Sequence, residues 1–303
     1  MTDTLPPLPI VDPTALAEIA PGIHVISDRR VPLVPNIGIV LGNDAALVID
    51  TGMGPENGRK VLEVAKQLAG NRRLMLTLTH FHPEHGFGAQ AFKGAARIMY
   101  NAAQRDELAA KGAAYLGMFR GFGPGVAAAL EGTELVMPDE VYDGASSKID
   151  LGGRIVELTT YGLAHTKGDQ VVDVPDAGVI FVGDLAEERI FPIFPWFPPD
   201  DADLDADNWA RVLGSLAATK PTVVVPGHGS VGGSEILLTV RDYILDLGPR
   251  VAAGVKASDS VDAIVASLGP LVRAEHPDWQ APEWIDFAIR YFVARVETVE
   301  RRE

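Results

Sequence analysis

The chain has 303 residues, of which 47% are hydrophobic and 22% charged, a composition typical of a globular protein and not of a disordered one. Lys and Arg number 26 against 41 Asp and Glu, and the resulting net charge of −15 argues against binding to the phosphate backbone of nucleic acid. The sequence has no cysteine, which excludes disulfides, Fe–S clusters and thiolate nucleophiles, so any metal site must use His and carboxylate ligands.

Residues 1–21 are expected to form a proline-rich N-terminal arm, because Pro6, Pro7, Pro9 and Pro13 oppose regular structure. This stretch lacks the basic start and sustained apolar run of a secretory signal. The apolar runs further along fall short of the roughly 18 residues that a membrane helix needs. We therefore expect a cytoplasmic protein with no membrane partner.

The chain from residue 22 onward shows strand and helix patterns in turn. Short apolar runs predict strands at 23–26, 37–41, 46–49 and 74–79. The second and third of these form a predicted hairpin, because a Gly-Asn-Asp turn separates them. Apolar residues at helical spacing predict a helix over 55–69.

The middle of the chain begins with an Ala-rich helical insertion at 101–132, interrupted by glycines near 121–125. A helix is predicted at about 207–218, and only helix patterns follow residue 235. Further strands are predicted at 154–158, 170–174, 179–182 and 222–225. These patterns indicate a mixed α/β domain over residues 22–303, with its core at 22–235 and C-terminal helices at 236–303.

The last predicted helix carries one apolar stripe, which fits either a core-facing helix or the interface of a homodimer. Its residues are Ile285, Ala288, Ile289, Phe292, Val293 and Val296.

The segment Thr-His-Phe-His-Pro-Glu-His, residues 79–85, carries the most specific signal in the chain and directly follows a predicted strand. Its imidazole and carboxylate side chains suit Zn²⁺, and also Fe or Mn. His80 and His82 can point the same way, because side chains of extended backbone alternate with period two. Glu84 and His85 lie beyond the turn at Pro83 and can face a second ion.

Three isolated residues lie in similar places further along the chain. His165 lies between two predicted strands, and Asp184 and His228 each follow one. Taken singly, a loop position, a helix N-cap and a turn would explain them. A sheet would nevertheless bring all of these loops to one edge, where sites of α/β proteins commonly lie.

Together with Asp50 in Val48-Ile49-Asp50-Thr51-Gly52, these segments occur in the order of the five motifs of the metallo-β-lactamase fold superfamily, which the chain resembles over residues 22–235. The resemblance implies a four-layer αββα sandwich with two metal ions, expected to be zinc with iron or manganese as alternatives, at one edge. It further implies that His80, His82 and His165 hold the first metal, that Glu84, His85 and His228 hold the second, that Asp184 bridges both, and that Asp50 orients the ligands.

Glu84 departs from the family pattern, which has Asp at this position of the run His-x-His-x-Asp-His. The side chain is longer by one methylene, whereas metal–ligand distances tolerate only about 0.2 Å. Either the backbone or the second metal must shift, or Glu84 must ligate differently. The substitution therefore bears on the occupancy of the second metal site.

Aromatic residues suggest the walls of a substrate pocket. The proline-rich segment 191–199 contains Phe191, Phe194 and Trp196 and cannot form a helix. It would wall a pocket opposite Phe119 and Phe122 of the helical insertion, or else bury itself against the core. The acidic residues at 200–203 are interpreted as a solvated lead-in to the next helix.

The ligand set predicts a metal-dependent hydrolase acting on an ester, lactone, thioester or cyclic amide of a small, partly apolar molecule. A metal-bound hydroxide would be the nucleophile, with Glu84 and Asp184 as the catalytic carboxylates. The alternatives are a β-lactamase proper, an iron-dependent redox enzyme of the same fold, and a protein that keeps the fold with an impaired second metal site. Nucleic-acid processing is not expected, given the net charge of −15.

Overall fold

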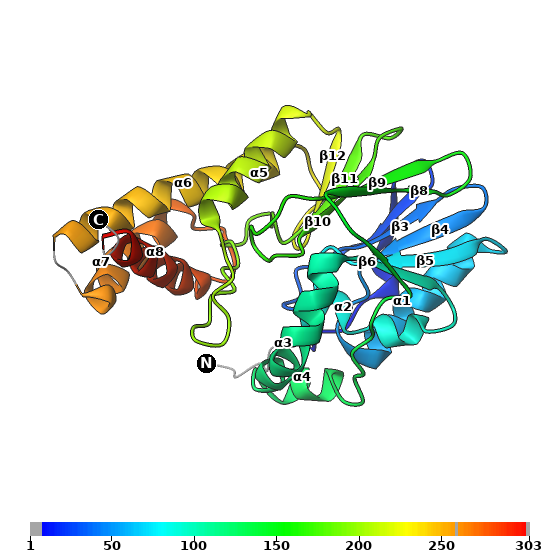
Figure 1. The fold of residues 1–303 in the computed structure, drawn as a ribbon, viewed down its shortest axis with the longest axis horizontal. Helices are drawn as coiled ribbons and strands as arrows, with labels where there is room; N and C mark the ends of the chain where they lie inside the picture. The colour runs from blue at the N-terminus through cyan, green and yellow to red at the C-terminus, as the bar shows by residue number, and fades with distance from the viewer. Residues whose placement is uncertain (1–7, 258–259, 301–303) are drawn as a thin grey trace.

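The computed structural model of the chain describes residues 8–257 and 260–300. Two β-sheets lie face to face and helices cover both outer sides, as Figure 1 shows, which confirms the expected αββα sandwich. The first sheet has the strand order β1-β2-β3-β4-β5-β6-β7 and the second the order β12-β11-β10-β9-β8. The first sheet consists of β1 (Leu16–Ala20), β2 (Ile23–Ile26), β3 (Ile37–Leu41), β4 (Ala45–Ile49), β5 (Arg73–Thr77), β6 (Arg97–Asn101) and β7 (Glu140–Tyr142). The second consists of β8 (Ser146–Asp150), β9 (Ile155–Thr160), β10 (Gln170–Val174), β11 (Val179–Gly183) and β12 (Val223–Pro226).

The facing sides of the two sheets enclose one apolar core. Val40 and Leu47 of the first sheet and Val172 and Phe181 of the second belong to the same buried cluster. Side chains of a strand alternate between its two faces, so the opposite faces remain for the helices to cover. Within the described residues, no helix combines the length and the apolar character that crossing a membrane requires.

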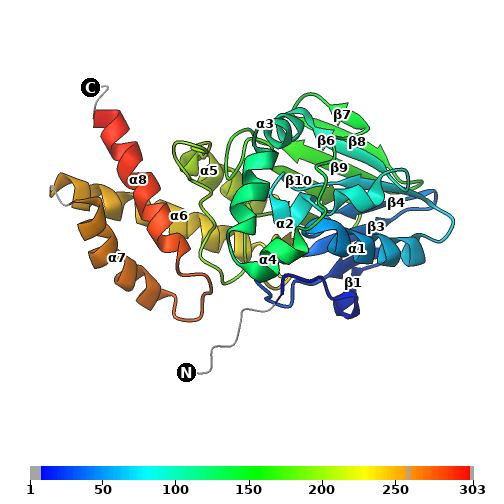
Figure 2. The ribbon, with the colours of Figure 1, turned by 90° about the horizontal axis from the view of Figure 1, so that it is seen from below.

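The helices divide between the two outer faces. Helix α1 buries Val61 and Ala65 on the outer side of the first sheet, and α5 and α6 pack on the outer side of the second, as Figure 2 also shows. The helices are α1 (Gly54–Ala69), α2 (Pro83–Gly86), α3 (Ala102–Arg120), α4 (Pro124–Ala129), α5 (Ala206–Ala218), α6 (Glu235–Lys256), α7 (Val261–Glu275) and α8 (Trp284–Glu300), with short 3-10 turns at Pro13–Ala15 and Ala89–Phe92. The insertion corresponds to α3 and α4, and Figures 1 and 2 both place α6, α7 and α8 together at one end.

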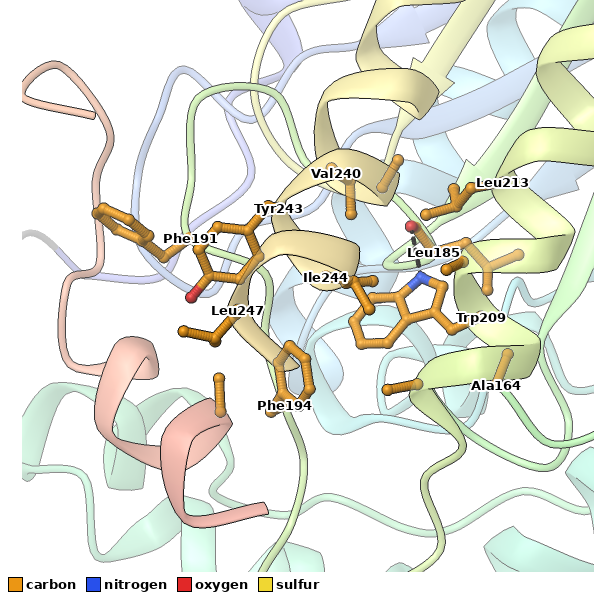
Figure 3. Close-up of a cluster of buried hydrophobic side chains, with 14 of the residues drawn as sticks. Ala164, Leu185, Phe191, Phe194, Trp209, Leu213, Val240, Tyr243, Ile244 and Leu247 are labelled. Carbon is orange, nitrogen blue, oxygen red and sulfur yellow. Dashed lines mark hydrogen bonds between the residues drawn. The ribbon is translucent and has the colours of Figure 1, made fainter. Parts of the chain in front are cut away.

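The apolar stripe of α8 packs inside its own chain. Ile285, Ile289 and Phe292 are at most 5% exposed and join the cluster that contains Trp209, whose Nε1 donates a hydrogen bond to the Leu185 carbonyl at 2.8 Å. Figure 3 shows this cluster between α5, α6 and the loop that follows β11. The core therefore accounts for five of the six stripe residues.

The prediction of an irregular N-terminal arm is wrong for residues 13–20, which form a 3-10 turn and a strand. Residues 16–20 form β1, which pairs antiparallel with β2, and Val11 and Ala15 are buried. The prolines lie outside this five-residue strand, so they do not interrupt its hydrogen bonds. The domain therefore begins before residue 22, while residues 1–7 of the predicted arm lie outside the described residues.

Strands β6, β7 and β8 have no counterpart among the predicted elements. Strand β8 alternates exposed and less exposed residues around one buried position, Ile149, so it lacks a continuous apolar run. Strand β5 also ends at Thr77, two residues earlier than expected. The histidine segment consequently begins in irregular backbone that is free to turn into α2.

Candidate metal centre

The predicted metal ligands come from separate segments that the two sheets bring to one edge. His80 and His82 follow β5, Glu84 and His85 lie in α2, and the remaining three lie in loops after β9, β11 and β12. All seven side chains are buried. Their ligand atoms form two groups, each within 4.8 Å: His80, His82, His165 and Asp184, and Glu84, His85, Asp184 and His228. These groups coincide with the two ligand sets implied by the sequence resemblance.

The atoms that face one another in this cluster have no hydrogen-bond partner. They are Nε2 of His80, His82, His85, His165 and His228, Oε2 of Glu84, and both carboxylate oxygens of Asp184. Polar atoms buried without a partner are rare and costly, because they lose their contacts with water. Imidazole nitrogens and carboxylate oxygens are the donors that zinc and related metals prefer, so the donor set fits two metal ions.

Asp184 lies between the two groups. Its Oδ1 is 3.2 Å from Nε2 of His85 and 3.7 Å from Nε2 of His228, while its Oδ2 is 3.7 Å from Nε2 of His80. One carboxylate oxygen therefore faces each group, as a bridging ligand requires.

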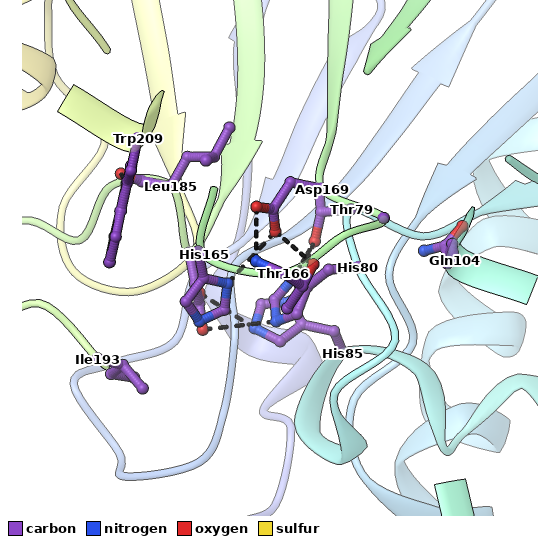
Figure 4. Close-up of polar contacts among 12 residues, drawn as sticks. Thr79, His80, His85, Gln104, His165, Thr166, Asp169, Leu185, Ile193 and Trp209 are labelled. Atoms are coloured by element: carbon purple, nitrogen blue, oxygen red, sulfur yellow. Dashed lines mark hydrogen bonds and ion pairs between the residues drawn. The ribbon is translucent and has the colours of Figure 1, made fainter. Parts of the chain in front are cut away.

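The Nδ1 atoms of three histidines lie within hydrogen-bonding distance of oxygen atoms elsewhere in the protein. Nδ1 of His85 lies 2.8 Å from Oδ2 of Asp50, and Nδ1 of His228 lies 2.9 Å from the Val34 carbonyl. Nδ1 of His165 lies 3.3 Å from Oδ1 of Asp169, a contact visible in Figure 4. Such contacts fix the orientation of each ring and direct its Nε2 toward the cluster.

Sequence reasoning identified Asp50 but missed Asp169 and Thr79. Thr79 donates its backbone N–H to Oδ1 of Asp50 at 2.7 Å and its hydroxyl to Oδ2 at 2.8 Å. Asp169 also accepts a hydrogen bond from the backbone N–H of Thr166 at 2.7 Å. The position of Asp169, four residues after His165, was the signal available in the sequence.

The loop that carries His228 approaches the cluster very closely. A Cβ atom at Gly227 would lie 1.8 Å from Oδ1 of Asp184, so a larger residue would displace this carboxylate. Asn36 donates from Nδ2 to the carbonyls of Pro226 and Gly229, at 3.0 and 2.8 Å. Asn36, another residue missed in the sequence, therefore holds the loop from both sides.

Burial and charge tune the ionisable groups of the cluster. Burial lowers the pKa values of His80 and His82 well below the ordinary value, which favours the neutral rings that metal binding requires. Burial also opposes the charged form of His85, but the carboxylates of Asp184 and Asp50 outweigh it and raise the pKa of His85. Burial raises the pKa of Glu84. The cluster thus shifts the pKa values of several of these groups away from those that they have in water.

Glu84 reaches the second group in spite of its additional methylene. It belongs to α2, where it is 3% exposed, and one of its carboxylate oxygens lies within 4.8 Å of the ligand atoms of His85, Asp184 and His228. The fold therefore accommodates Glu where the family pattern has Asp.

Comparison with known proteins assigns the chain to a family. The family model described as "Metallo-beta-lactamase superfamily" matches residues 30–228, which is more than half of the chain. The chain belongs to this superfamily.

Among curated proteins, the chain is similar to the acyl-coenzyme A thioesterase MBLAC2 of Homo sapiens, with 26% identity over 230 residues that cover 70% of this chain and 80% of the relative. It is also similar to the linear primary-alkylsulfatase of Pseudomonas sp. (strain ATCC 19151), with 25% identity over 254 residues that cover 74% of this chain and 48% of that protein. The chain therefore spans about half the length of the alkylsulfatase.

Solved structures show the same fold. DIM-1 metallo-beta-lactamase superposes with a TM-score of 0.59 at 16% identity, over 79% of this chain and 99% of that one. A double mutant of the sec-alkyl sulfatase PisA1 superposes with a TM-score of 0.69 at 18% identity, over 92% of this chain and 50% of that one.

A cavity of about 570 Å³ opens onto the candidate metal centre. His82, Glu84 and His228 form part of its lining, and Phe119 and Phe122 of the helical insertion lie on its wall. The segment after residue 190 contributes Ile190, Ile193, Pro195 and Phe197. Most of the lining surface is therefore apolar, with the candidate ligands as its polar part.

Phe191, Phe194 and Trp196 do not line this cavity, contrary to the expectation from the sequence. Phe191 and Phe194 are 0% exposed within the apolar core, and Trp196 packs against the same cluster. The alternative reading, in which aromatic residues anchor this segment to the core, describes these three. Anchored in this way, the segment presents the side chains between them to the cavity.

The sequence suggested that the acidic stretch at 200–203 is solvated, but the structure shows that one of its aspartates is buried. Asp201 is 5% exposed and accepts hydrogen bonds from Tyr115 Oη at 2.7 Å and from Lys111 Nζ at 3.0 Å. Lys111 also pairs with Glu107 at 3.0 Å and with Asp203 at 2.8 Å. This network ties the cavity-lining segment after β11 to α3.

Proposed function

We propose that this chain is a metal-dependent hydrolase with two zinc ions, acting on an ester, lactone, thioester or cyclic amide of a small, partly apolar molecule. One observation carries the proposal: eight buried polar atoms without partners converge at the side of an apolar cavity. Bound metal would lower the pKa of water toward neutrality and polarise a carbonyl group.

The residues of the chain would then hold the metal ions, orient the histidine rings and exclude water from the reacting bond. The five histidines, Glu84 and Asp184 would hold the two ions, and Asp50, Asp169 and the Val34 carbonyl would orient three of the rings. The carboxylate of Glu84 lies on the cavity lining with Oε2 unpartnered, so it is positioned to orient an attacking water and to accept its proton. The apolar walls would exclude other water from the reacting bond.

The named relatives support an apolar substrate portion. One is named for acyl-coenzyme A thioester hydrolysis and the other for alkyl sulfate hydrolysis, and both names denote an acyl or alkyl group. The apolar cavity of this chain agrees with a substrate that carries such a group.

The test is a metal-dependent activity panel on purified protein. Portions stripped with a chelator and reloaded with Zn²⁺, Mn²⁺ or Fe²⁺ are assayed on a p-nitrophenyl ester, a lactone, an acyl thioester and a chromogenic β-lactam. We expect zinc-dependent turnover of at least one of the first three substrates, and the variant His80→Ala should lose it. Bound iron with oxygen consumption, or no turnover with any metal, would overturn the proposal.

A further inference from the structure

We infer that the cavity selects an uncharged ester with a bulky apolar group, and that α8, which lies beyond the superfamily match, supplies the selecting wall through Trp284 and Phe287. This inference rests on the proposed hydrolase function and narrows its substrate class. Three observations carry it: a continuous aromatic wall, the two-faced packing of α8, and the charges around the cavity.

Aromatic rings connect the metal centre to the C-terminal helix. The ring of Tyr115 stacks on His82, with centroids 5.1 Å apart and planes 19° apart. The centroid of Phe197 lies 6.3 Å from that of Tyr115 and 5.6 Å from that of Phe287. Trp284 in turn lies 5.0 Å from Phe287. Because all except the last contact join residues of different segments, the fold itself assembles this wall.

Helix α8 has two apolar faces with different environments. Ile285, Ala288 and Ile289 are at most 4% exposed in the core, whereas Trp284 and Phe287 are half-buried and line the cavity. Residues three apart lie on the same side of a helix, so Trp284 and Phe287 form one patch. The exposed parts of these two aromatic side chains form an apolar surface in the cavity that a ligand can cover.

Among the described residues, the cavity lining offers no free Lys or Arg side chain to an anionic substrate. Arg30 is the only Lys or Arg among the described lining residues, and both terminal nitrogens of its guanidinium contact Glu188. Asp28 and Glu283 also line the cavity. Lys111, which lies behind the aromatic wall, forms ion pairs with Glu107, Asp201 and Asp203.

The net charge of the whole chain also disfavours an anionic substrate. Its net charge of −15 disfavours the approach of anions to the protein. An acyl-coenzyme A carries phosphates and an alkyl sulfate carries a sulfate, and such groups are usually met by paired Arg or Lys side chains. An uncharged ester needs no such partner, and it is therefore the substrate that this cavity favours.

The size of the cavity indicates the bulk of the apolar group. Its volume of about 570 Å³ falls within the roughly 300–1,000 Å³ of sites for drug-sized ligands. An acetyl group would leave most of this apolar surface uncovered, whereas a longer chain or an aromatic group would cover it.

A binding experiment tests the charge preference independently of turnover. Zinc-loaded protein is titrated calorimetrically with 1-decanol and with decyl sulfate, which share one chain and differ in charge. We expect 1-decanol to bind at least tenfold more tightly. Equal or tighter binding of decyl sulfate would overturn the inference, even if the protein proves to be a zinc hydrolase.

A kinetic experiment tests the role of α8. The ratio of kcat/KM for p-nitrophenyl decanoate to kcat/KM for p-nitrophenyl acetate is compared in wild type and in Phe287→Ala. We expect the ratio to fall at least tenfold, about 1.4 kcal/mol, and 1-decanol binding to weaken in parallel. The matched control Leu245→Ala, on the exposed side of α6 and 54% exposed, should keep the wild-type ratio.

The outcomes separate the two proposals. If Phe287→Ala fails to fold, Trp284→Ala replaces it, because Trp284 also lies on α8 and lines the cavity. An unchanged ratio in a folded cavity variant would overturn the inference and leave the hydrolase function intact. If no substrate of the panel is turned over with any metal, the hydrolase function fails, while the 1-decanol titration still decides the charge preference.

Discussion

Asp50 joins His85 to Thr79, which lies two residues after the end of strand β5. Its Oδ2 lies 2.8 Å from Nδ1 of His85 and accepts the hydroxyl of Thr79, whose backbone N–H is donated to Oδ1. All three side chains are at most 3% exposed, so water does not compete for these contacts. The Nε2 of His85 is thereby fixed in the direction of the second ligand group.

Replacing Asp50 should weaken the second metal site selectively. In Asp50→Asn the amide nitrogen would face Nδ1–H of His85, donor against donor, and the ring would lose its orientation. Loss of such a supporting contact typically lowers metal affinity by about 10- to 100-fold. Zinc affinity is measured by competition with a chromogenic chelator, with the exposed Asp143→Asn as control. Two unaltered zinc affinities would show that Asp50 does not orient His85.

The length of Glu84 is the second testable feature of the centre. Its carboxylate already lies within the second ligand group, so Glu84→Ala should reduce zinc content from two ions per chain to one. Glu84→Asp restores the residue of the family pattern and should preserve the second ion. Elemental analysis of both variants gives the answer. If Glu84→Asp loses the ion as Glu84→Ala does, the longer side chain is required at this site.

The fold and the candidate ligands were largely predictable from the sequence, because both depend on local patterns. Apolar runs predicted central strands such as β4 and β11, whose residues are all buried. The histidine motif follows another apolar run, which forms β5. Strand β8 was missed because it lies at the edge of its sheet, where polar residues are tolerated. Strand β1 was missed because its neighbouring prolines dominate the local composition.

The orienting contacts and the cavity lining were predicted less well, because they depend on distant parts of the chain. Asn36 contacts residues about 190 positions away, and no local pattern reports such a pairing. Phe194 and Phe197 lie three residues apart in one segment, yet one is in the core and the other on the cavity wall. In a non-helical, non-strand segment no fixed period assigns side chains to faces, so only the packed structure distinguishes them.

Removing the metal should destabilise the protein. Eight buried polar atoms would then lack partners, and the buried histidines and carboxylates would face one another without a cation between them. Zinc at about 100 times its dissociation constant stabilises a folded protein by about 2.7 kcal/mol per site. We expect Tm to fall on chelation and to recover when zinc is added back, as measured by scanning calorimetry. The variant His80→Ala/His82→Ala should recover less, and no shift in wild type would argue against a metal site.

The buried ion pairs behind the cavity wall should be important for stability. Lys111 contacts Glu107 and Asp201, whose side chains are only 3% and 5% exposed. Lys111→Met would leave both carboxylates buried without their cation, which costs about 3–5 kcal/mol. Lys93 pairs with Glu134 at the surface, and Lys93→Met should cost about 0–1 kcal/mol. Urea unfolding of the two variants measures the contrast, and equal losses would contradict the role assigned to Lys111.

The ion pair between α5 and α8 should make stability depend on pH in a defined direction. Hydrogen bonds from Arg295 lower the pKa of Asp207 below its ordinary value, and one of them spans 2.9 Å. Because the folded-state pKa is lower than the unfolded one, this contribution is fully present above the unfolded value of 3.8 and is lost as pH falls through the folded value. The Asp207 side chain is 69% exposed, so solvent screening limits the contribution to about 0.2–1 kcal/mol.

Asp207→Asn removes this charge and provides the test. The variant should be less stable than wild type at pH 6, and the difference should shrink as pH decreases below 3.8, where the aspartate of the wild type becomes protonated. Urea unfolding at a series of pH values measures the difference, with Asp143→Asn, at an exposed position, as the matched control. A difference that is constant over this range would mean that the Asp207 side chain acts through a contact other than its charge, because only the charge titrates there.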